Sequence, residues 1–487
     1  MSDLRVADVI RGMAAERPEA VAIRHRERAL TYAELDERSN RLANALLAAG
    51  AGAGSRIAHL DRSAPEVVEL LAAAAKLGGV AVPLNWRLAV PELGAIVTDA
   101  AAPFLIAGPE FMDVARSVAD AVPQPLTVVG VGEEYEAWLA ASDDVDPGGR
   151  GEPADPVLQM YTSGTTGVPK GVLTTHRNLE AATFNVPTWS FDPDSVSLTP
   201  LPMFHVGGIG WTYLGLSQGA TTILVSEFDA AGVLDQLESE RVTNAVFVPT
   251  ILQLLTSVPG AAERDFSALR SIAYGASPIT TPVLKAALRT FDCELYGVYG
   301  LTETTGGVVL LSPEDHQREE LLRAAGKPCP WMELQVVDGE VWLRGPNVMA
   351  GYANRPAETA AALTADGWLR TGDGGYLDAD GYLFLTDRIK DMIVTGGENV
   401  YPIEVEEALA HHPAVQEVAV IGVPDPRWGE TVKALVVLRE EASEEDLIGF
   451  ARERLAGYKL PRSIELVEDL PHTPSGKVLK HELRARY

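Results

Sequence analysis

Cysteine and positive charge are both scarce in this sequence of 487 residues. Only Cys293 and Cys329 occur, with no paired spacing, so nothing supports a disulfide framework or a cysteine zinc cluster, and a reducing cytoplasm is favoured. Lysine and arginine total 40 against 68 aspartates and glutamates, and the net charge of −28 opposes binding to nucleic acid or anionic lipid. The sequence also lacks a signal-peptide core and any apolar run long enough for a bilayer, so we expect no membrane insertion.

The remaining composition is that of a globular protein with more than one domain. Residues 31–50 are predicted to form a helix, with a capping box of Thr31 and Glu34 at its start and Gly50 at its end. Similar helical patterns alternate with apolar runs such as 244–248, as is typical of strands buried between helices.

A change in the pattern of predicted strands and turns marks the expected domain boundary. After about residue 333, shorter strands and turn signals predict an antiparallel hairpin around 378–381. The charged segment 386–391 precedes a proline-started helix over 402–410 and a strand over 415–423. We predict a mixed α/β and α+β protein, with an N-terminal domain over 1–386 that includes a β-rich subdomain, a connecting segment at 387–391 and a small α+β domain over 392–487.

Residues 161–171 read YTSGTTGVPKG and follow the strand-like run 157–160. Glycines let backbone N–H groups surround an anion, the Ser and Thr hydroxyls add donors, and Lys170 supplies a compact positive charge. The composition favours the phosphates of a nucleoside triphosphate, although the spacing does not fit the Walker A pattern. A plain surface loop is the alternative for this segment taken alone.

Two further segments offer nucleotide contacts. In YGLTET, Tyr299 presents a flat face to a base, Thr302 a donor to phosphate and Glu303 a hard oxygen to Mg²⁺. In WLRTGD, Asp373 can accept both hydroxyls of a ribose, and Arg388 can close on the same ribose or phosphates. The alternatives are a core tyrosine, two ordinary turn carboxylates and a surface ion pair.

Lys477 stands near the C-terminus on a turn built from proline, serine and glycine. Attack of a carboxylate on a phosphate joins two anions, so a positive charge acting with Mg²⁺ would lower the barrier. Lys477 is the candidate for that charge, and a solvated lysine is the alternative.

Five segments, in this order, resemble the signatures of the adenylate-forming superfamily, which contains acyl-CoA synthetases, luciferases and peptide-synthetase adenylation domains. They read YTSGTTGVPKG, YGLTET, WLRTGD, DRIKDMIVTGGENVYP and PSGKVLK, and they span most of the chain. With IGVPDPRWGE and LAGYKLP included, the pattern is most similar to bacterial fatty acyl-CoA synthetases and the related feruloyl-CoA synthetases. Ordered agreement of five motifs strengthens the functional interpretation of each one.

The resemblance implies a two-step reaction with ATP, Mg²⁺ and coenzyme A. The substrate carboxylate attacks the α-phosphate to give acyl-AMP and pyrophosphate, and the thiol of coenzyme A then displaces AMP. It further implies that a mobile C-terminal domain pivots at a hinge in 387–391 between the two steps. This motion would withdraw Lys477 and bring the Gly396-Gly397 loop to the pantetheine channel, for which a simple turn is the alternative.

The resemblance also implies a role for each matching residue. Thr302 would contact the α-phosphate, Glu303 would hold Mg²⁺, and Lys477 would bridge the carboxylate and the α-phosphate. Asp373 and Arg388 would hold the ribose, and the adenine would lie against Gly275, Ala276 and Tyr299. The β- and γ-phosphates would be held by Thr162, Ser163, Gly164, Thr165, Thr166, Gly167 and Lys170.

His205 follows Phe204 at the position where amino-acid-activating relatives place an aspartate, which argues against an amino-acid substrate. We expect His205 to line or gate an acyl tunnel, with a hydrogen-bonded core histidine as the alternative. The glycine-rich stretch 207–210 gives room without a fixed cation, and this suits a fatty acid or a flat aryl-propenoic acid better than a dicarboxylate. We prefer a fatty acid, with Trp211 shortening the tunnel toward medium chains.

Other functions stay open beside a fatty acid–CoA ligase. A feruloyl- or cinnamoyl-type ligase uses the same motifs, as does a ligase that loads a carrier protein in trans. A nucleotide-binding scaffold without chemistry is disfavoured because Lys170, Glu303, Asp373 and Lys477 are all present. We expect a small carboxylic acid, ATP and coenzyme A as partners, no nucleic acid, and leave a homodimer open.

Overall fold

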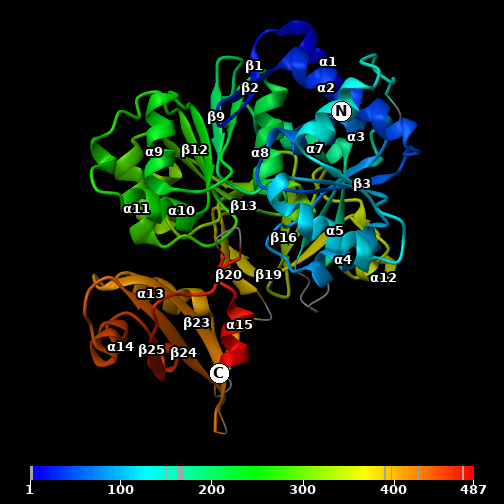
Figure 1. The fold of residues 1–487 in the computed structure, drawn as a ribbon. Coiled ribbons are helices and arrows are strands. Elements are labelled where there is room, and N and C mark those ends of the chain that lie inside the picture. The colour runs from blue at the N-terminus through cyan, green and yellow to red at the C-terminus, as the bar shows by residue number, and fades with distance from the viewer. Residues whose placement is uncertain are drawn as a thin grey trace.

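The computed structural model describes residues 4–149, 151–162, 169–388, 391–395, 398–425, 427–473 and 477–487. Within these residues the strands form four sheets, and the last of them belongs to a C-terminal part that stands apart below the rest in Figure 1. Among the described helices, none combines the length and the apolar character needed to cross a membrane.

Five parallel strands and two antiparallel ones form a seven-stranded sheet. Its order is β18 (Gly351–Tyr352), β8 (Lys170–Thr175), β7 (Pro156–Thr162), β4 (Val80–Pro83), β3 (Arg56–Leu60), β5 (Phe104–Ala107) and β6 (Thr127–Gly130). Helices α3 (Pro65–Leu77), α4 (Val90–Ala100) and α5 (Met112–Ala121) make the crossovers between the parallel strands. Because β7 and β8 are antiparallel, the glycine-rich segment joins the two strands of a hairpin.

The second sheet has nine strands. Its order is β15 (Lys327–Pro328), β14 (Gly306–Leu311), β13 (Glu294–Leu301), β12 (Ser271–Gly275), β11 (Asn244–Phe247), β9 (Val196–Thr199), β10 (Thr221–Leu224), β1 (Val21–His25) and β2 (Arg28–Thr31). Alternation along β12 sends Ile272 and Tyr274 into a core with α9 (Ala230–Ser239), α10 (Pro249–Thr256) and α11 (Thr281–Phe291). Ala273 faces the other way, toward α8 (Val206–Ser217).

The remaining helices of the large part are α1 (Val6–Glu16), α2 (Tyr32–Ala48), α6 (Glu133–Ala140) and α7 (His176–Ala182). The predicted capping box is confirmed at the start of α2, where Glu34 N donates to Thr31 Oγ1 at 3.2 Å and Thr31 N donates to Glu34 Oε2 at 2.8 Å. The predicted end is confirmed as well, since Gly50 has a φ of +96° just beyond the helix.

A four-stranded sheet forms the β-rich part. Its strands are β16 (Glu333–Val337), β17 (Glu340–Arg344), β19 (Leu369–Leu377) and β20 (Leu383–Arg388), and α12 (Pro356–Ala362) lies between β17 and β19 in the chain. The expected hairpin joins β19 and β20 through a turn closed by the bond from Gly381 N to Asp378 O. Its register makes Asp373 and Arg388 cross-strand partners.

The C-terminal part has a hydrophobic core of its own. It contains β21 (Ile393–Thr395), β22 (Glu398–Val400), α13 (Pro402–Ala410), β23 (Val415–Asp425), β24 (Gly429–Leu438), α14 (Glu444–Arg452), β25 (Ser463–Leu466) and α15 (Lys480–Arg486). The predicted helix 402–410 is therefore confirmed, and the predicted strand from 415 runs two residues further than expected. The hinge itself stays a prediction, because Ile389 and Lys390 lie outside the described residues.

Candidate active site

Tyr352 contacts both Lys170 and Glu303, which lie far apart in the sequence. Lys170 is the first residue of β8, where it pairs in register with Thr162 at the end of β7. Its Nζ lies 5.1 Å from the centroid of the Tyr352 ring, and the Tyr352 hydroxyl donates to Glu303 Oε1 at 2.8 Å. A cation and a carboxylate thus meet beside the ends of the β7–β8 hairpin. The predicted phosphate contacts from Ser163 to Gly167 lie outside the described residues.

Thr302 and Glu303 occupy a short 3-10 turn, Thr302–Thr304, at the C-terminal end of β13. The turn begins with a bond from Leu301 N to Thr304 Oγ1 at 2.8 Å, and Glu303 O accepts from Met349 N at 2.8 Å. Only glycine fits at position 300, because a Cβ there would stand 1.9 Å from Gly306 O. The tight return of β13 into β14 therefore fixes both candidate side chains at the sheet edge where ligands bind in α/β folds.

Tyr299 and Asp373 are also joined, although 74 residues separate them. The Tyr299 hydroxyl donates to Asp373 Oδ2 at 2.8 Å, and the backbone of Arg388 lies opposite Asp373 in the β19–β20 ladder. On the neighbouring strand end, a Cβ at Gly275 would stand 2.1 Å from Val298 O, and Ala276 has a φ of +68°. Four of the five predicted base and ribose contacts therefore lie together, near the ends of β12 and β13 and on the middle of β19, namely Gly275, Ala276, Tyr299 and Asp373. The Arg388 side chain is not among the described groups.

His205 precedes α8 and its Nε2 is buried without a hydrogen-bond partner among the described residues. Its ring centroid lies 4.5 Å from that of Phe204. Burial, with a smaller contribution from the nearby charge of Arg87, lowers the pKa of His205 from 6.5 to about 4. The ring is thus a neutral one, and the expectation of a hydrogen-bonded core histidine finds no support at Nε2.

Lys477 is positioned by local contacts of the C-terminal part. Its N–H donates to Thr473 Oγ1 at 3.0 Å, its carbonyl accepts from Thr473 N at 2.6 Å, and the adjoining Val478 forms a bridge with His472. Its approach to Thr302 and the α-phosphate stays a prediction. The Gly396-Gly397 pair lies outside the described residues.

Residues 10–353 match the AMP-binding enzyme family, and residues 404–477 match the AMP-binding enzyme C-terminal domain. The chain belongs to the AMP-binding enzyme family. The chain is 42% identical to the feruloyl-CoA synthase of an Amycolatopsis species over 96% of each protein, and 40% identical to the fatty acid–[acyl-carrier-protein] ligase ScoC of Streptomyces coeruleorubidus over 97% of this chain and 95% of that one. The ATP-bound structure of MatB from Rhodopseudomonas palustris superposes with a TM-score of 0.91 at 29% identity and 99% coverage of both chains.

Membership of this family confirms the expected reaction class. The protein is an AMP-forming acid–thiol ligase, an acyl-CoA synthetase that uses ATP, Mg²⁺ and coenzyme A. The expected mixed α/β fold, with a large N-terminal and a smaller C-terminal domain, is confirmed as well.

The carboxylate of Glu303 fits the Mg²⁺ that AMP-binding enzymes use. Mg²⁺ in nucleotide sites is held by one or two carboxylates together with phosphate oxygens and waters, so a cage of protein ligands is not required. Across the part of the chain that the structure describes, no cluster of three or more His, Cys, Asp or Glu side chains could hold a metal alone. Glu303, partly buried and aligned by Tyr352, supplies the hard oxygen that such a site needs.

Sequence reasoning missed Tyr352 and Arg87. Tyr352 contacts both Lys170 and Glu303, yet 49 residues separate it from Glu303 and no motif marks it. Arg87 stacks on Trp86, 3.9 Å from the ring centroid, and lies 6.0 Å from that of Phe204. The contact of Tyr352 with Glu303 and the approach of Arg87 to Phe204 depend on how distant strands and helices pack, so no local signal in the sequence identifies them.

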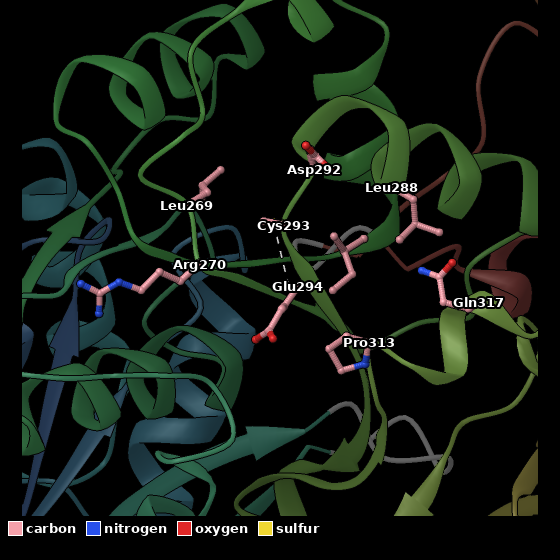
Figure 2. A pocket seen from close by; sticks show the side chains of 9 residues that line it. Leu269, Arg270, Leu288, Asp292, Cys293, Glu294, Pro313 and Gln317 are labelled. Atoms are coloured by element: carbon pink, nitrogen blue, oxygen red, sulfur yellow. Dashed lines mark hydrogen bonds between the residues drawn. The ribbon is translucent and has the colours of Figure 1, made fainter.

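A surface hollow, shown in Figure 2, lies at the opposite end of the same strands. It is lined by Leu269, Arg270, Leu288, Asp292, Cys293, Glu294, Leu295, Pro313 and Gln317. Arg270 directly precedes β12 and Glu294 begins β13, whereas the nucleotide candidates stand where these strands end. Burial raises the pKa of the Cys293 thiol to about 12, which keeps it protonated and unreactive. The hollow is therefore separate from the candidate active site.

Proposed function

We propose that the enzyme activates a monocarboxylic acid with an uncharged tail as its acyl-AMP and transfers the acyl group to coenzyme A. The observation that best supports the proposed residue roles is that Tyr352 contacts both Lys170 and Glu303. It supports a role for Lys170 at the phosphates and for Glu303 at Mg²⁺, because both side chains lie near the ends of β7 and β8, the strands that flank the segment whose composition suits phosphates. Medium- or long-chain fatty acids are the first candidates for the substrate.

In the first step an oxygen of the substrate carboxylate bonds to the α-phosphorus, and the bond from that phosphorus to the oxygen shared with the β-phosphate breaks. Pyrophosphate leaves with the electron pair. Lys170 and the loop hydroxyls would hold the β- and γ-phosphates, and Thr302 would donate to the α-phosphate. Lys477 would neutralise the two anions that approach each other. Mg²⁺, which Glu303 would hold, supplies charge neutralisation at the phosphates.

In the second step the thiol sulfur of coenzyme A, having lost its proton, bonds to the acyl carbon, and the carbon–oxygen bond to AMP breaks. Asp373, Tyr299 and Gly275 would hold the adenosine of the acyl-AMP throughout. A rotation of the C-terminal domain would replace Lys477 by the Gly396-Gly397 loop, whose missing side chains would admit the pantetheine arm.

Two other substrate assignments have specific support. An aryl-propenoic acid is favoured by the feruloyl-CoA synthase relative, and a carrier protein as thiol donor by the relative ScoC. The free state of both cysteines supports a cytoplasmic location. A homodimer stays an expectation.

Incubation with ATP, Mg²⁺ and each of several acids tests the proposal. We expect pyrophosphate release that depends on the acid, followed by acyl-CoA when coenzyme A is added. Accumulation of acyl-AMP with no thioester in the presence of free coenzyme A would instead indicate a carrier-protein ligase. Absence of carboxylate-dependent pyrophosphate exchange would contradict the activity altogether.

A further inference from the structure

The position of Tyr352 depends on the short segment that carries it. We refer to residues 351–355, which run from β18 to the start of α12, as the strap. The strap begins on the edge strand β18, which pairs with β8, and Ala353 N donates to Gly171 O at 2.8 Å. It therefore lies along β8, next to Lys170. A two-residue edge strand holds the strap at one end only.

The other end of the strap is bonded to Asp99 on α4, which lies beside α12 in Figure 1. Asn354 has a φ of +55°, a left-handed conformation that asparagine tolerates, and its Nδ2 donates to Asp99 O at 2.7 Å across 255 residues. Arg355 Nη2 lies 3.5 Å from Asp99 Oδ1. Two consecutive strap residues thus contact the same aspartate.

Asp99 is also bonded to the strand that leads into the glycine-rich segment. The Tyr161 hydroxyl donates to Asp99 Oδ2 at 2.8 Å and accepts from Gln159 Nε2 at 2.8 Å. Burial, together with the hydrogen bond to Asp99, raises the pKa of Tyr161, so this hydroxyl keeps its proton as the donor. Tyr161 directly precedes Thr162, the register partner of Lys170.

The helix that carries Asp99 does not account for a carboxylate at this position. Asp99 is the second-last residue of α4, where a negative charge opposes the helix dipole, and the last turn contains no basic residue. Its carbonyl belongs to the last turn, which lacks donors within the helix, and Asn354 supplies one. The side chains of Asp99 and Arg355 are only 21% and 31% exposed. The contacts outside α4 therefore explain the aspartate.

The two segments that Asp99 contacts lie on either side of β8. The sheet order β18, β8, β7 puts the strand of Lys170 between them. Tyr352 reaches across from the strap, with its ring centroid 5.1 Å from Lys170 Nζ and its hydroxyl 2.8 Å from Glu303 Oε1. A strap released from Asp99 would be free to move away from β8, and both contacts of Tyr352 would then lengthen.

We propose that Asp99 is a positioning residue for acyl-AMP formation, which aligns Lys170 and Glu303 by holding the strap and β7 together. The inference rests on the proposed function and adds a residue that no motif marks. Asp99 acts through Tyr352 rather than on the substrate. Loss of Asp99 should therefore impair the use of ATP and Mg²⁺ and spare the binding of the acid.

Asp99→Ala tests this role through pyrophosphate release, measured over a range of ATP, acid and Mg²⁺ concentrations. We expect kcat/KM for ATP to fall by about tenfold, the Mg²⁺ concentration for half-maximal rate to rise several fold, and KM for the acid to stay within about twofold. Asp99→Asn keeps an acceptor for Tyr161 and loses the charge that faces Arg355, so its effect should be intermediate. The Mg²⁺ midpoint does not depend on how much of a variant is folded.

A double-mutant cycle with Tyr352→Phe separates positioning from general stabilisation. Because both changes act on the alignment of Glu303, the double variant should lose at most a few fold more than the larger single loss, whereas independent losses would multiply to about a hundredfold. Asp113→Ala is the matched control, since Asp113 also faces an arginine, Arg116, at 3.5 Å but lies on the surface of α5. It should leave kcat/KM and the Mg²⁺ midpoint unchanged.

An unchanged kcat/KM for ATP in Asp99→Ala would overturn the inference. It would also be overturned if the losses multiplied in the double variant, or if the loss fell equally on ATP and the acid with the Mg²⁺ midpoint unchanged, since Asp99 would then only stabilise the fold. Absence of acid-dependent pyrophosphate release from the wild type would instead contradict the proposed function.

Discussion

The proposed nucleotide contacts of the large domain and the proposed catalytic lysine near the C-terminus are held in contrasting ways. Tyr299 is bonded to Asp373 and Tyr352 to Glu303 across 74 and 49 residues, between elements of a continuous framework. Lys477 bonds through its backbone to Thr473, four residues away, in a part with its own core. The residues proposed to act in both steps are thus held by packing between distant elements of the large domain. Lys477, which is proposed to act in the first step only, belongs to the C-terminal domain.

Described hydrogen bonds between the two parts are made at α10 and α11, and α13 also lies against β20. Gln253 Nε2 donates to Gln416 O at 2.6 Å, and Thr281 N lies 3.4 Å from both carboxylate oxygens of Glu407. Polar contacts of this kind resemble those of interfaces that open and close, rather than a shared hydrophobic core. This supports a domain that changes its orientation between the two steps.

Lys477→Ala is expected to have the largest effect. Acyl-AMP formation should fall by about 10³-fold or more, because the two approaching anions lose their neutralising charge. Thioester formation from supplied acyl-AMP should stay within a few fold of the wild type. Single-turnover measurements of each step separate the two effects.

Lys480→Ala is the matched control for that variant. Lys480 lies three residues further on and pairs with Glu406 at 2.8 Å within the C-terminal part. It should leave both steps nearly unchanged. If Lys477→Ala slowed both steps equally, Lys477 would not be specific to acyl-AMP formation, and the contrast between the two regions would be wrong.

Asp373→Ala should act on both steps through nucleotide binding. We expect KM for ATP to rise by about 10–100-fold, with a smaller change in KM for the acid, because a partly buried acceptor for the ribose hydroxyls is lost. Tyr299→Phe removes the bond to Asp373 and should produce part of the same rise. A larger effect on the acid than on ATP would show that Asp373 does not contact the ribose.

Buried histidines make the large domain sensitive to acid. Burial lowers the pKa of His59 from 6.5 to about 4, so the unfolded chain takes up the proton first and stability falls as pH drops below 6.5. The loss between pH 8 and pH 5 is about 2 kcal/mol for this one group. In urea unfolding, His59→Leu should lose that much less than the wild type over the same range, and an identical loss would contradict the assignment.

Tyr352→Phe tests the contact chain from Lys170 to Glu303. The ring beside Lys170 is kept, and only the bond to Glu303 is removed. We expect about a tenfold loss in kcat/KM for ATP, greatest at low Mg²⁺, because the carboxylate is no longer aligned. Tyr376→Phe, on the exposed part of β19, is the control. A loss that does not depend on Mg²⁺ would argue against the metal role of Glu303.

His472, beside the Lys477 turn, should respond to pH in the opposite direction from His59. The hydrogen bond to Glu417, at 2.5 Å, raises the pKa of His472, so its contribution is present below pH 6.5 and is lost as pH rises through the raised value. Hydrogen exchange of the Lys477 amide, corrected for intrinsic rates, should show weaker protection at high pH. Protection that is constant with pH would show that this pair does not hold the turn.

Local signals predicted several helix and strand elements correctly. The capping box of α2, the proline-started α13 and the β19–β20 turn follow from short-range rules, and the structure has all three. Contacts that depend on the packing of elements far apart in the chain could not be predicted from the sequence, as the contacts of Tyr352 and Trp189 show. Trp211 was expected to shorten an acyl tunnel; its place in an aromatic cluster is compatible with that prediction but also reveals an unpaired donor that no pattern marks.

The most direct test measures the distance between the two domains in each step. Spin labels at Arg116 and Arg486, both exposed, would replace these side chains after Cys293 and Cys329 are changed to serine. With ATP and a non-reactive acid analogue the account predicts one dominant distance, and with an acyl-AMP analogue and coenzyme A a different one. Suppose that the labelled variant still completes both reactions but shows the same single distance in both states. That result would contradict the proposal that Lys477 lies at the nucleotide in the first step and moves away for the second.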